Sequence, residues 1–223
     1  MGNVELLIRS IKKRGLINTL RYVIHEFTFD WANNTDTKPA LANYDPANDR
    51  PETFVGPYQG ANPYIVNQCI ARCSQLGLEI CNASFLDLGA GKGRVMLLAA
   101  LYGFKKVIGV ELDANLCLVA RRNLEINKGK MKCCNYEVCN EDAANYVFPE
   151  NLNVVFMFNA FDTQLIRGVL KKLTAKSNSN TKISRHEDLY IIYLNPIYAR
   201  VFVEFGLTPL VNVMHEALIY RID

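Results

Sequence analysis

The sequence predicts an α/β protein built on a mostly parallel sheet with helices on both faces. From residue 63 onward, short apolar runs alternate with segments of helical period, the pattern of repeated strand and helix units. The apolar runs are continuous, as expected for strands that are covered on both sides. The last two runs have no helix between them, so we expect them to pair as an antiparallel hairpin at one edge.

Each element follows from this pattern. Strands are predicted at 84–88, 106–111, 134–138, 153–158, 189–194, 208–214 and 216–222. Helices are predicted at 63–76, 93–102, 114–127, 162–175 and 197–205. Asp113 is placed to cap the third of these helices. A polar run between residues 176 and 188 predicts a surface loop.

The N-terminal region has a different character. Residues 3–26 have a helical period, with a break or kink expected at Gly15. Residues 28–63 are rich in Asn, Asp, Pro and Thr and show no period, so we expect irregular structure there. We therefore divide the chain into an N-terminal basic helix with an irregular leader, residues 1–54, and a main domain, residues 55–223.

The composition is that of an ordinary globular protein and excludes a disordered chain. Of 223 residues, 50% are hydrophobic and 21% are charged. The longest apolar run, at 95–102, is too short to span a bilayer, and the N-terminus lacks the pattern of a secretory signal. These features favour a cytoplasmic location. Seven cysteines without a C-x-x-C pair, and three scattered histidines, predict neither a disulfide framework nor a metal site.

Positive charge is concentrated at the start of the chain. The first 25 residues carry five basic residues and one acidic residue, a net charge of +4, whereas the remainder sums to −1. The basic helix could lie on an anionic membrane surface or guide an acidic substrate. The pattern favours a third interpretation, in which its apolar stripe packs on the domain and its charges face water. The nearly neutral body disfavours a nucleic-acid partner.

The strongest functional signal is D-L-G-A-G-K-G-R at residues 87–94, between a predicted strand and a predicted helix. Glycines let the backbone approach a ligand closely, and free N–H groups at a helix start favour an anionic group. Glu111 follows Gly89 by 22 positions, where a carboxylate can accept hydrogen bonds from both hydroxyls of a ribose. The spacing differs from the G-x-G-x-x-G of dinucleotide-binding folds and so disfavours an NAD-dependent oxidoreductase.

This loop resembles motif I of the class I S-adenosylmethionine-dependent methyltransferases, and V-E-L at 110–112 resembles their acidic second motif. The likeness covers roughly residues 55–223. It is strongest to a bacterial group of uncharacterised members with D-[FL]-G-[SA]-G-K-G-R and F-N-P-F motifs, whose leader is also similar to residues 29–30, 35–37 and 49–51. The resemblance implies a three-layer Rossmann-like methyltransferase fold. It also implies S-adenosylmethionine as the cofactor, with S-adenosylhomocysteine as its product.

The resemblance further implies a role for each matching residue. Asp87 would lie near the ammonium of the cofactor, and Tyr58 would belong to a loop that closes over it. The other implied cofactor contacts are Gly89, Ala90, Gly91 and Gly93 at the methionine part, Glu111 and Leu112 at the ribose, and Asp142, Ala143 and Asn159. Asp142 corresponds to the acidic residue that meets the adenine amino group.

The F-N-A-F-D run at residues 158–162 resembles the F-N-P-F motif, with Ala160 where the group has proline. It is more distantly similar to the N-P-P-Y signature of amino-group methyltransferases. The resemblance implies that Asn159 and Phe161 lie at the acceptor, with Asp162 or Tyr58 as a general base. Structural roles are the alternatives: a strand end for Asn159, a turn or cap for Asp142, and a buried anchor for Tyr58.

These observations predict a methyltransferase that acts on a protein amine such as lysine, with a small molecule as the second candidate. The alternative is a domain of the same fold that binds the cofactor or a partner without catalysis. Fold alone does not choose between acceptors.

Overall fold

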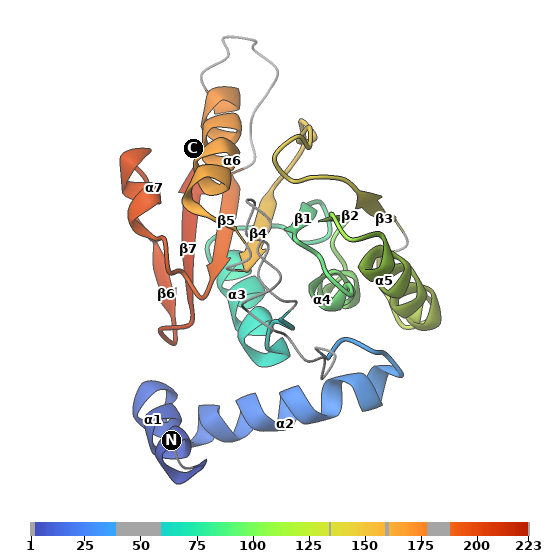
Figure 1. The fold of residues 1–223 in the computed structure, drawn as a ribbon, viewed down its shortest axis with the longest axis vertical. Helices are drawn as coiled ribbons and strands as arrows, with labels where there is room; N and C mark the ends of the chain where they lie inside the picture. The colour runs from blue at the N-terminus through green and yellow to red at the C-terminus, as the bar shows by residue number, and fades with distance from the viewer. Residues whose placement is uncertain (1–2, 39–58, 134, 159–160, 178–187, 223) are drawn as a thin grey trace, which may run out of the picture.

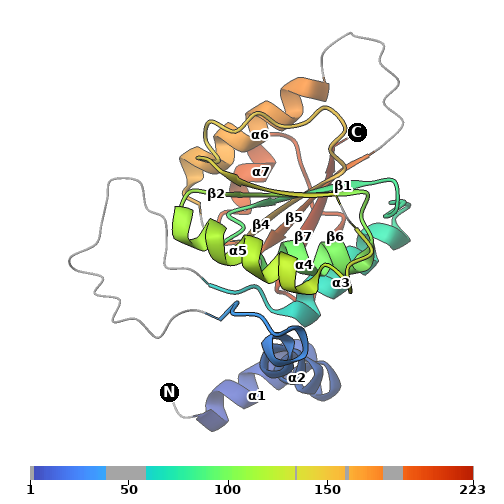
Figure 2. The same ribbon diagram turned by 90° about the vertical axis from the view of Figure 1, so that its right-hand side faces the viewer.

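The computed structural model describes residues 3–38, 59–133, 135–158, 161–177 and 188–222. The predicted site residues Tyr58 and Asn159, and Ala160 beside the latter, lie outside these ranges. From residue 59 onward the described residues form three layers, with helices on both faces of one sheet, and the N-terminal helices lie outside these layers (Figure 1 and Figure 2). The predicted α/β architecture is confirmed.

The described part of the chain forms a seven-stranded sheet in the order β3-β2-β1-β4-β5-β7-β6. The strands are β1 Ser84–Leu88, β2 Lys106–Glu111, β3 Tyr136–Asn140, β4 Val154–Phe158, β5 Leu189–Leu194, β6 Val211–Val213 and β7 Ala217–Ile222. The pairs from β3 to β5 are parallel, whereas β7 pairs antiparallel with both β5 and β6. The predicted parallel sheet with an antiparallel C-terminal strand is therefore confirmed.

Helices α3, α4 and α5 cover one face of the sheet, and α6 and α7 cover the other (Figure 2). Their bounds are α3 Pro63–Gln75, α4 Arg94–Tyr102, α5 Ala114–Asn127, α6 Thr163–Ser177 and α7 Arg200–Glu204. Because side chains alternate along a strand, the strands feed two cores. Phe85 and Phe156 belong to the core under α3 and α4, whereas Leu86 and Val155 belong to the core under α6.

Strand β1 lies where the strand order reverses, with β2 on one side and β4 on the other. The register places Asp87 opposite Gly109 of β2 and opposite Phe156 of β4. Open parallel sheets bind ligands beyond the carboxyl ends of their strands at such a reversal. A ligand site is therefore expected at the carboxyl ends of β1, β2 and β4.

The C-terminal hairpin is shorter than its sequence pattern indicated. Strand β6 covers only Val211–Val213, whereas a strand over 208–214 was expected. Met214 and His215 adopt left-handed backbone conformations, with φ of 54° and 57°, so the chain turns directly after β6. The Asn212 Oδ1 atom accepts the His215 N–H at 2.9 Å and holds this turn.

The N-terminal region contains two helices, α1 Asn3–Arg14 and α2 Leu16–Asn33. The expected break at Gly15 is confirmed, and its φ of 80° suits glycine. Helix α2 continues to residue 33, through a segment that was expected to be irregular from residue 28. Burial of Phe29 stabilises this extra length, and the left-handed Asn34 ends the helix with its N–H on the Asp30 carbonyl.

The interpretation that the apolar stripe packs on the domain is wrong for α2. The side of this helix that contacts the domain carries polar groups: the Asn18 side chain accepts the Tyr64 hydroxyl at 2.8 Å, and Glu26 pairs with Arg94. Apart from Phe29 and Tyr22, which pack against the domain, the large apolar side chains of α2 lie on the opposite side and are exposed. The reason is that the domain has buried polar groups at its contact with α2, and these groups need hydrogen-bond or ion-pair partners, which the polar side chains of α2 provide.

Candidate functional site

The glycine loop joins the end of β1 to the start of α4. Gly89, Gly91 and Gly93 all have positive φ, at 77°, 54° and 77°, a conformation that favours glycine. The N–H groups of Gly89 and Ala90 both donate to the Val110 carbonyl, at 2.9 and 3.0 Å. The loop therefore folds back against the end of β2. A side chain at Gly93 would place its Cβ 3.0 Å from Cβ of Ala120 on α5, so the packing also requires glycine there.

Glu111 fixes the loop from the end of β2. Its buried carboxylate accepts the Gly91 N–H at Oε2, at 2.8 Å, and the Asp113 N–H at Oε1, at 2.9 Å. A carboxylate has about four lone-pair positions, so each oxygen can accept one further hydrogen bond. Glu111 can thus hold the loop and still receive a pair of ligand hydroxyls.

Asp87 is the buried carboxyl group at the centre of the site. Within the described residues its Oδ2 atom has no hydrogen-bond partner, although the side chain is only 2% exposed. Burial, with a smaller contribution from the negative charge of Glu111, raises the pKa of Asp87 from 3.8 to about 8. An unpartnered buried carboxyl of this kind is suited to a cationic ligand group, which would restore its ionised form.

A small cavity of about 20 Å³ adjoins Asp87, with room for roughly one water molecule. It is lined by Gln59, Ala61, Asp87, Gly89, Ala90, Arg94, Val95, Phe156 and Phe158. Phe156 and Phe158 alternate along β4 on the same side as Asp87, a relationship that strand periodicity could have revealed. A ligand the size of a nucleoside requires the surrounding side chains to separate.

The two basic residues of the loop hold the N-terminal segment and were not assigned a role from the sequence. Arg94 is buried, and its Nε atom donates to Thr37 Oγ1 at 2.7 Å. Its Nη1 atom donates to Glu26 of α2 at 2.9 Å, and Nη2 lies 3.6 Å from Asp30. Three positions on α2 and just after it thus converge on one guanidinium.

Lys92 makes the second connection. Its ammonium donates to Asp36 Oδ1 at 2.9 Å and to the Lys38 carbonyl at 2.8 Å. Asn123 of α5 donates to the carbonyls of both Asp36 and Lys92, at 3.2 and 2.9 Å. Asp30 and Thr37 belong to this network. The sequence signal that could have predicted it was the similarity of residues 29–30 and 35–37 to the leader of the bacterial methyltransferase group.

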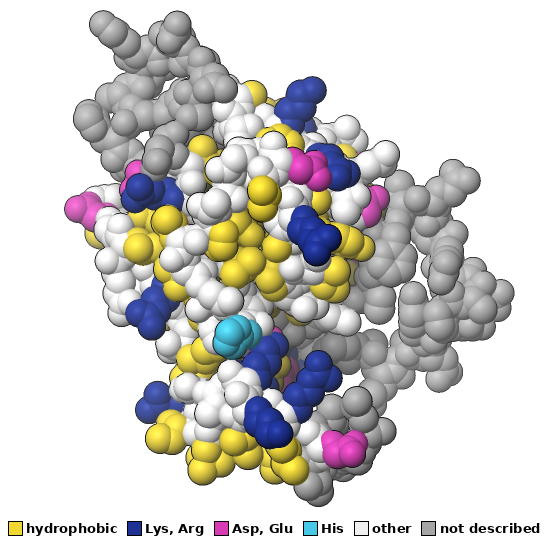
Figure 3. Space-filling model, turned by 90° about the vertical axis from the view of Figure 1, so that its left-hand side faces the viewer, with side chains coloured by type: hydrophobic (Ala, Val, Ile, Leu, Met, Phe, Trp, Pro, Cys, Tyr) yellow, Lys and Arg dark blue, Asp and Glu magenta, His cyan; other side chains and the backbone are white. Residues whose placement is uncertain are grey.

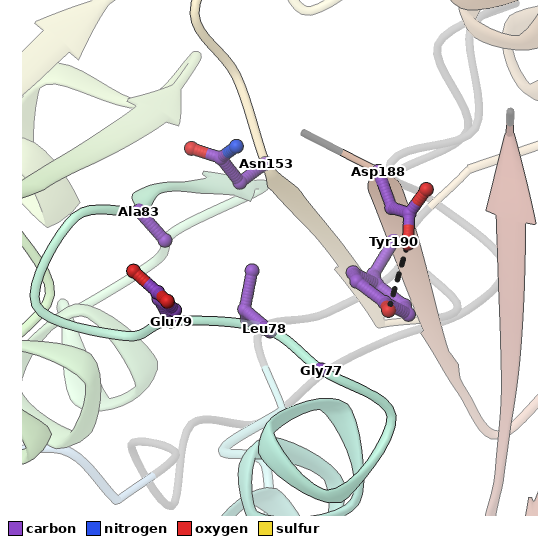
Figure 4. Close-up of a pocket in the computed structure, with 7 residues that line it drawn as sticks. All are labelled: Gly77, Leu78, Glu79, Ala83, Asn153, Asp188 and Tyr190. Atoms are coloured by element: carbon purple, nitrogen blue, oxygen red, sulfur yellow. Dashed lines mark hydrogen bonds between the residues drawn. The ribbon is translucent and has the colours of Figure 1, made fainter. Parts of the chain in front are cut away.

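A larger cavity of about 250 Å³ lies at the opposite edge of the sheet (Figure 4). It is lined by Gly77, Leu78, Glu79, Ala83, Asn153, Asp188 and Tyr190. Its polar groups serve the fold: Asn153 accepts the Ser84 N–H at 2.8 Å, and the Tyr190 hydroxyl donates to the Leu76 carbonyl at 3.0 Å. We place the functional site at the carboxyl ends of the strands, where the glycine loop, Asp87 and Glu111 meet.

Residues 85–177 match the family model of a methyltransferase domain. The matched residues run from β1 to the end of α6 and include the glycine loop, Glu111 and Asp142.

The sequence of ribosomal protein L11 methyltransferase from Aquifex aeolicus is 40% identical over 48 residues, which are 22% of this chain and 20% of that protein. The chain therefore matches about one fifth of the length of this relative.

Solved methyltransferase structures share the fold. A Pyrococcus horikoshii protein provisionally described as an RNA methyltransferase has a TM-score of 0.51 and 24% identity, covering 78% of this chain and 89% of its own. Magnesium protoporphyrin IX methyltransferase from Synechocystis PCC 6803, with S-adenosylmethionine bound, has a TM-score of 0.51 and 12% identity, covering 71% of this chain and 77% of its own. These likenesses confirm the Rossmann-like methyltransferase fold.

The residues predicted to lie at the adenine follow β3 directly. Asp142 is exposed and accepts the Ala144 N–H at 2.8 Å, so it serves a turn. Ala143 is buried beside it, whereas Leu112 is 55% exposed after β2. The Asn140 side chain donates to the Glu111 and Leu112 carbonyls, at 3.0 and 2.8 Å, and ties these two strand ends together. The cofactor roles of these residues stay predictions.

The predicted acceptor residues follow β4. Phe161 is half-buried against the core under α6, and Asp162 lies directly before that helix. The Asp162 Oδ1 atom accepts the Leu165 N–H at 2.8 Å, which is a helix-capping contact. Asn159 and Tyr58 lie outside the described residues. Of the four predicted catalytic residues, the structure therefore describes two, Phe161 and Asp162.

Proposed function

We propose that the protein transfers the methyl group of S-adenosylmethionine to an amino group of a protein substrate. The observation that carries the proposal is the buried Asp87 carboxyl, unpartnered at Oδ2 within the described residues, beside a glycine loop and Glu111 at the carboxyl edge of the sheet. The match of residues 85–177 to the family model of a methyltransferase domain supports the reaction class. The name of the Aquifex aeolicus relative, a methyltransferase of a ribosomal protein, supports a protein acceptor.

The residues present fit this cofactor. Asp87, once ionised, offers a carboxylate to its ammonium group, and the loop from Gly89 to Gly93 allows its backbone to approach closely. Glu111 can accept the two ribose hydroxyls through its remaining lone pairs. Asp142 would accept a hydrogen bond from the adenine amino group. When bound, the cofactor supplies a methyl group attached to a positively charged sulfur.

The chain's own residues would bind, orient and exclude water. With the cofactor bound, its methyl group would pass to an acceptor nitrogen held in line with it, and sulfur would keep the electron pair of the broken C–S bond. In this proposal Asn159 accepts a hydrogen bond from the acceptor nitrogen, and Phe161 packs beside it. Asp162 receives the departing proton at the oxygen that does not cap α6, and Tyr58 is the second candidate for this role.

Two observations favour a second candidate function, a methyltransferase-like domain without catalysis. The cavity beside Asp87 holds only about 20 Å³, and Ala160 replaces the proline of the motif. Such a domain would bind the cofactor or a partner and leave the methyl group in place.

Methyl transfer from labelled S-adenosylmethionine to fractions of a cell extract tests both candidates. We expect label in protein, lost on protease treatment and retained after RNase. Glu111→Ala should abolish the labelling, and Glu150→Ala, at an exposed position outside the site, should not change it.

Label in an RNase-sensitive fraction or in a small-molecule filtrate would contradict the proposed protein acceptor and would indicate RNA or a small molecule instead. The proposed methyltransferase activity would still be supported. Complete absence of transfer, with cofactor binding intact, would favour the domain without catalysis. Protein labelling that is identical in Glu111→Ala would contradict the proposed site.

A further inference from the structure

The two N-terminal helices form a layer of their own beneath the domain (Figure 1 and Figure 2). The rotation of α2 about its axis is fixed by its inner face. Phe29 and Thr19 are buried there, Glu26 and Asp30 meet Arg94, and Asn18 receives the Tyr64 hydroxyl. The side chains on the opposite face of α2 therefore point away from the domain.

That outer face is entirely apolar. Its members are between 40% and 86% exposed: Leu16, Ile17, Leu20, Val23, Ile24, Phe27 and Trp31. At about 100° per residue they cover an arc of roughly 120°, and at 1.5 Å per residue they extend over about 22 Å. Leu7 and Ile8 of α1 are also half-exposed. We call this set the α2 apolar face. A continuous exposed surface of this size marks an interaction site.

Positive charge lies beside the α2 apolar face. Arg9 and Lys12 of α1 and Arg21 of α2 are exposed, and Glu5 is the acidic side chain exposed on α1. The two carboxylates of α2, Glu26 and Asp30, are on its inner face with Arg94. Figure 3 shows hydrophobic side chains along the lower edge of the N-terminal helices with Lys and Arg side chains next to them. This combination is that of an amphipathic helix at the surface of an anionic bilayer.

The same charges argue against a second copy of the chain as the occupant. Two α2 apolar faces brought together would also bring together two sets of Arg9, Lys12 and Arg21, and like charges at an interface oppose association. An anionic lipid surface instead attracts them. Trp31 and Phe27, at the C-terminal part of the face, are residue types that favour the boundary between headgroups and acyl chains.

We propose that the α2 apolar face and its neighbouring cations bind the surface of a membrane that contains anionic phospholipid. The helix would lie in the plane of the interface. No helix among the described residues has the length and apolar content needed to cross a bilayer. The contact is therefore peripheral. This proposal is independent of the methyl acceptor and of the cofactor.

The chain carries its own probe, because Trp31 is the single tryptophan of the sequence. Its emission should shift to shorter wavelength with vesicles that contain phosphatidylserine and phosphatidylcholine, and should not shift with phosphatidylcholine alone. Co-sedimentation with the same vesicles gives the affinity. Leu20→Gln/Phe27→Gln, which keeps Trp31, should weaken binding by tenfold or more, on the order expected when two large apolar side chains no longer reach the acyl region.

Val147→Gln/Val203→Gln is the matched control, because both side chains are exposed outside the α2 apolar face. It should bind like the unmodified chain. Lys12→Gln/Arg21→Gln should also weaken binding, and added salt should weaken it further.

An unchanged Trp31 spectrum with both kinds of vesicle would overturn the proposal. A shift without lipid that grows with protein concentration, together with a dimer in light scattering, would assign the face to a second copy instead. Equal binding to both kinds of vesicle would overturn the role of anionic lipid.

Discussion

Replacement of Asp87 by Asn tests the electrostatic state of the site. The side chain is buried, and folding raises its pKa from 3.8 to about 8. Between these values the folded state holds a proton that the unfolded chain has released. The group's contribution to stability is therefore fully present below pH 3.8 and is lost as pH rises through 8. At about 1.36 kcal/mol per pH unit, the loss from pH 5 to pH 8 is on the order of 4 kcal/mol.

Asn has nearly the same size as Asp and stays neutral, so Asp87→Asn removes this titration without removing volume. Urea unfolding of both proteins at pH 5 and pH 8.5, without cofactor, measures the effect. We expect the stability of the variant relative to the unmodified protein to increase by about 4 kcal/mol from pH 5 to pH 8.5. The variant should bind S-adenosylhomocysteine poorly, because an amide cannot pair with an ammonium as a carboxylate does.

Glu150→Gln, at an exposed position, should follow the unmodified protein at both pH values. If the stabilities of Asp87→Asn and the unmodified protein ran parallel from pH 5 to pH 8.5, Asp87 would be ionised in the folded state. That result would refute the argument from burial.

Three further outcomes follow from the same site. Arg94→Met should lower the free energy of unfolding by about 3 kcal/mol, because it leaves the carboxylates of Glu26 and Asp30 without their buried partner. An unchanged midpoint of urea unfolding would contradict this. Gly93→Ala should cost about 1–2 kcal/mol at its φ of 77°, whereas Gly129→Ala, with open space around its Cβ position, should be nearly neutral; equal costs by thermal unfolding would refute the packing argument. Binding of S-adenosylhomocysteine at pH 6.5 should release close to one proton from Asp87, measured by calorimetry in buffers of different ionisation enthalpy; zero release would place the pKa of Asp87 below that pH.

The sheet was predictable because its signals are local. Residues 107–110 and 189–194 are uncharged and mostly apolar runs, and strands occur at 106–111 and 189–194. The glycine loop was predictable for the same reason, since its left-handed positions are glycines that follow each other closely. The positions of Asp87 and Glu111 then follow from parallel strands that end at one edge.

The N-terminal layer was not predictable from local pattern. Helix α2 extends to Asn33 because Phe29 and Asp30 make contacts with the distant domain, and Arg94 lies 64 positions beyond Asp30. The outward direction of the α2 apolar face depends on the same long-range ion pairs. A period in the sequence gives the apolar stripe of a helix, but the partner of that stripe is set by tertiary structure.

Calorimetric titration with S-adenosylhomocysteine, and separately with NAD, tests the central claim most directly. We expect micromolar binding of S-adenosylhomocysteine, no binding of NAD, and loss of the first in Glu111→Ala, whose carboxylate holds the loop and would receive the ribose. Binding of NAD in place of S-adenosylhomocysteine, or equal affinity in Glu111→Ala, would contradict the assignment of this site.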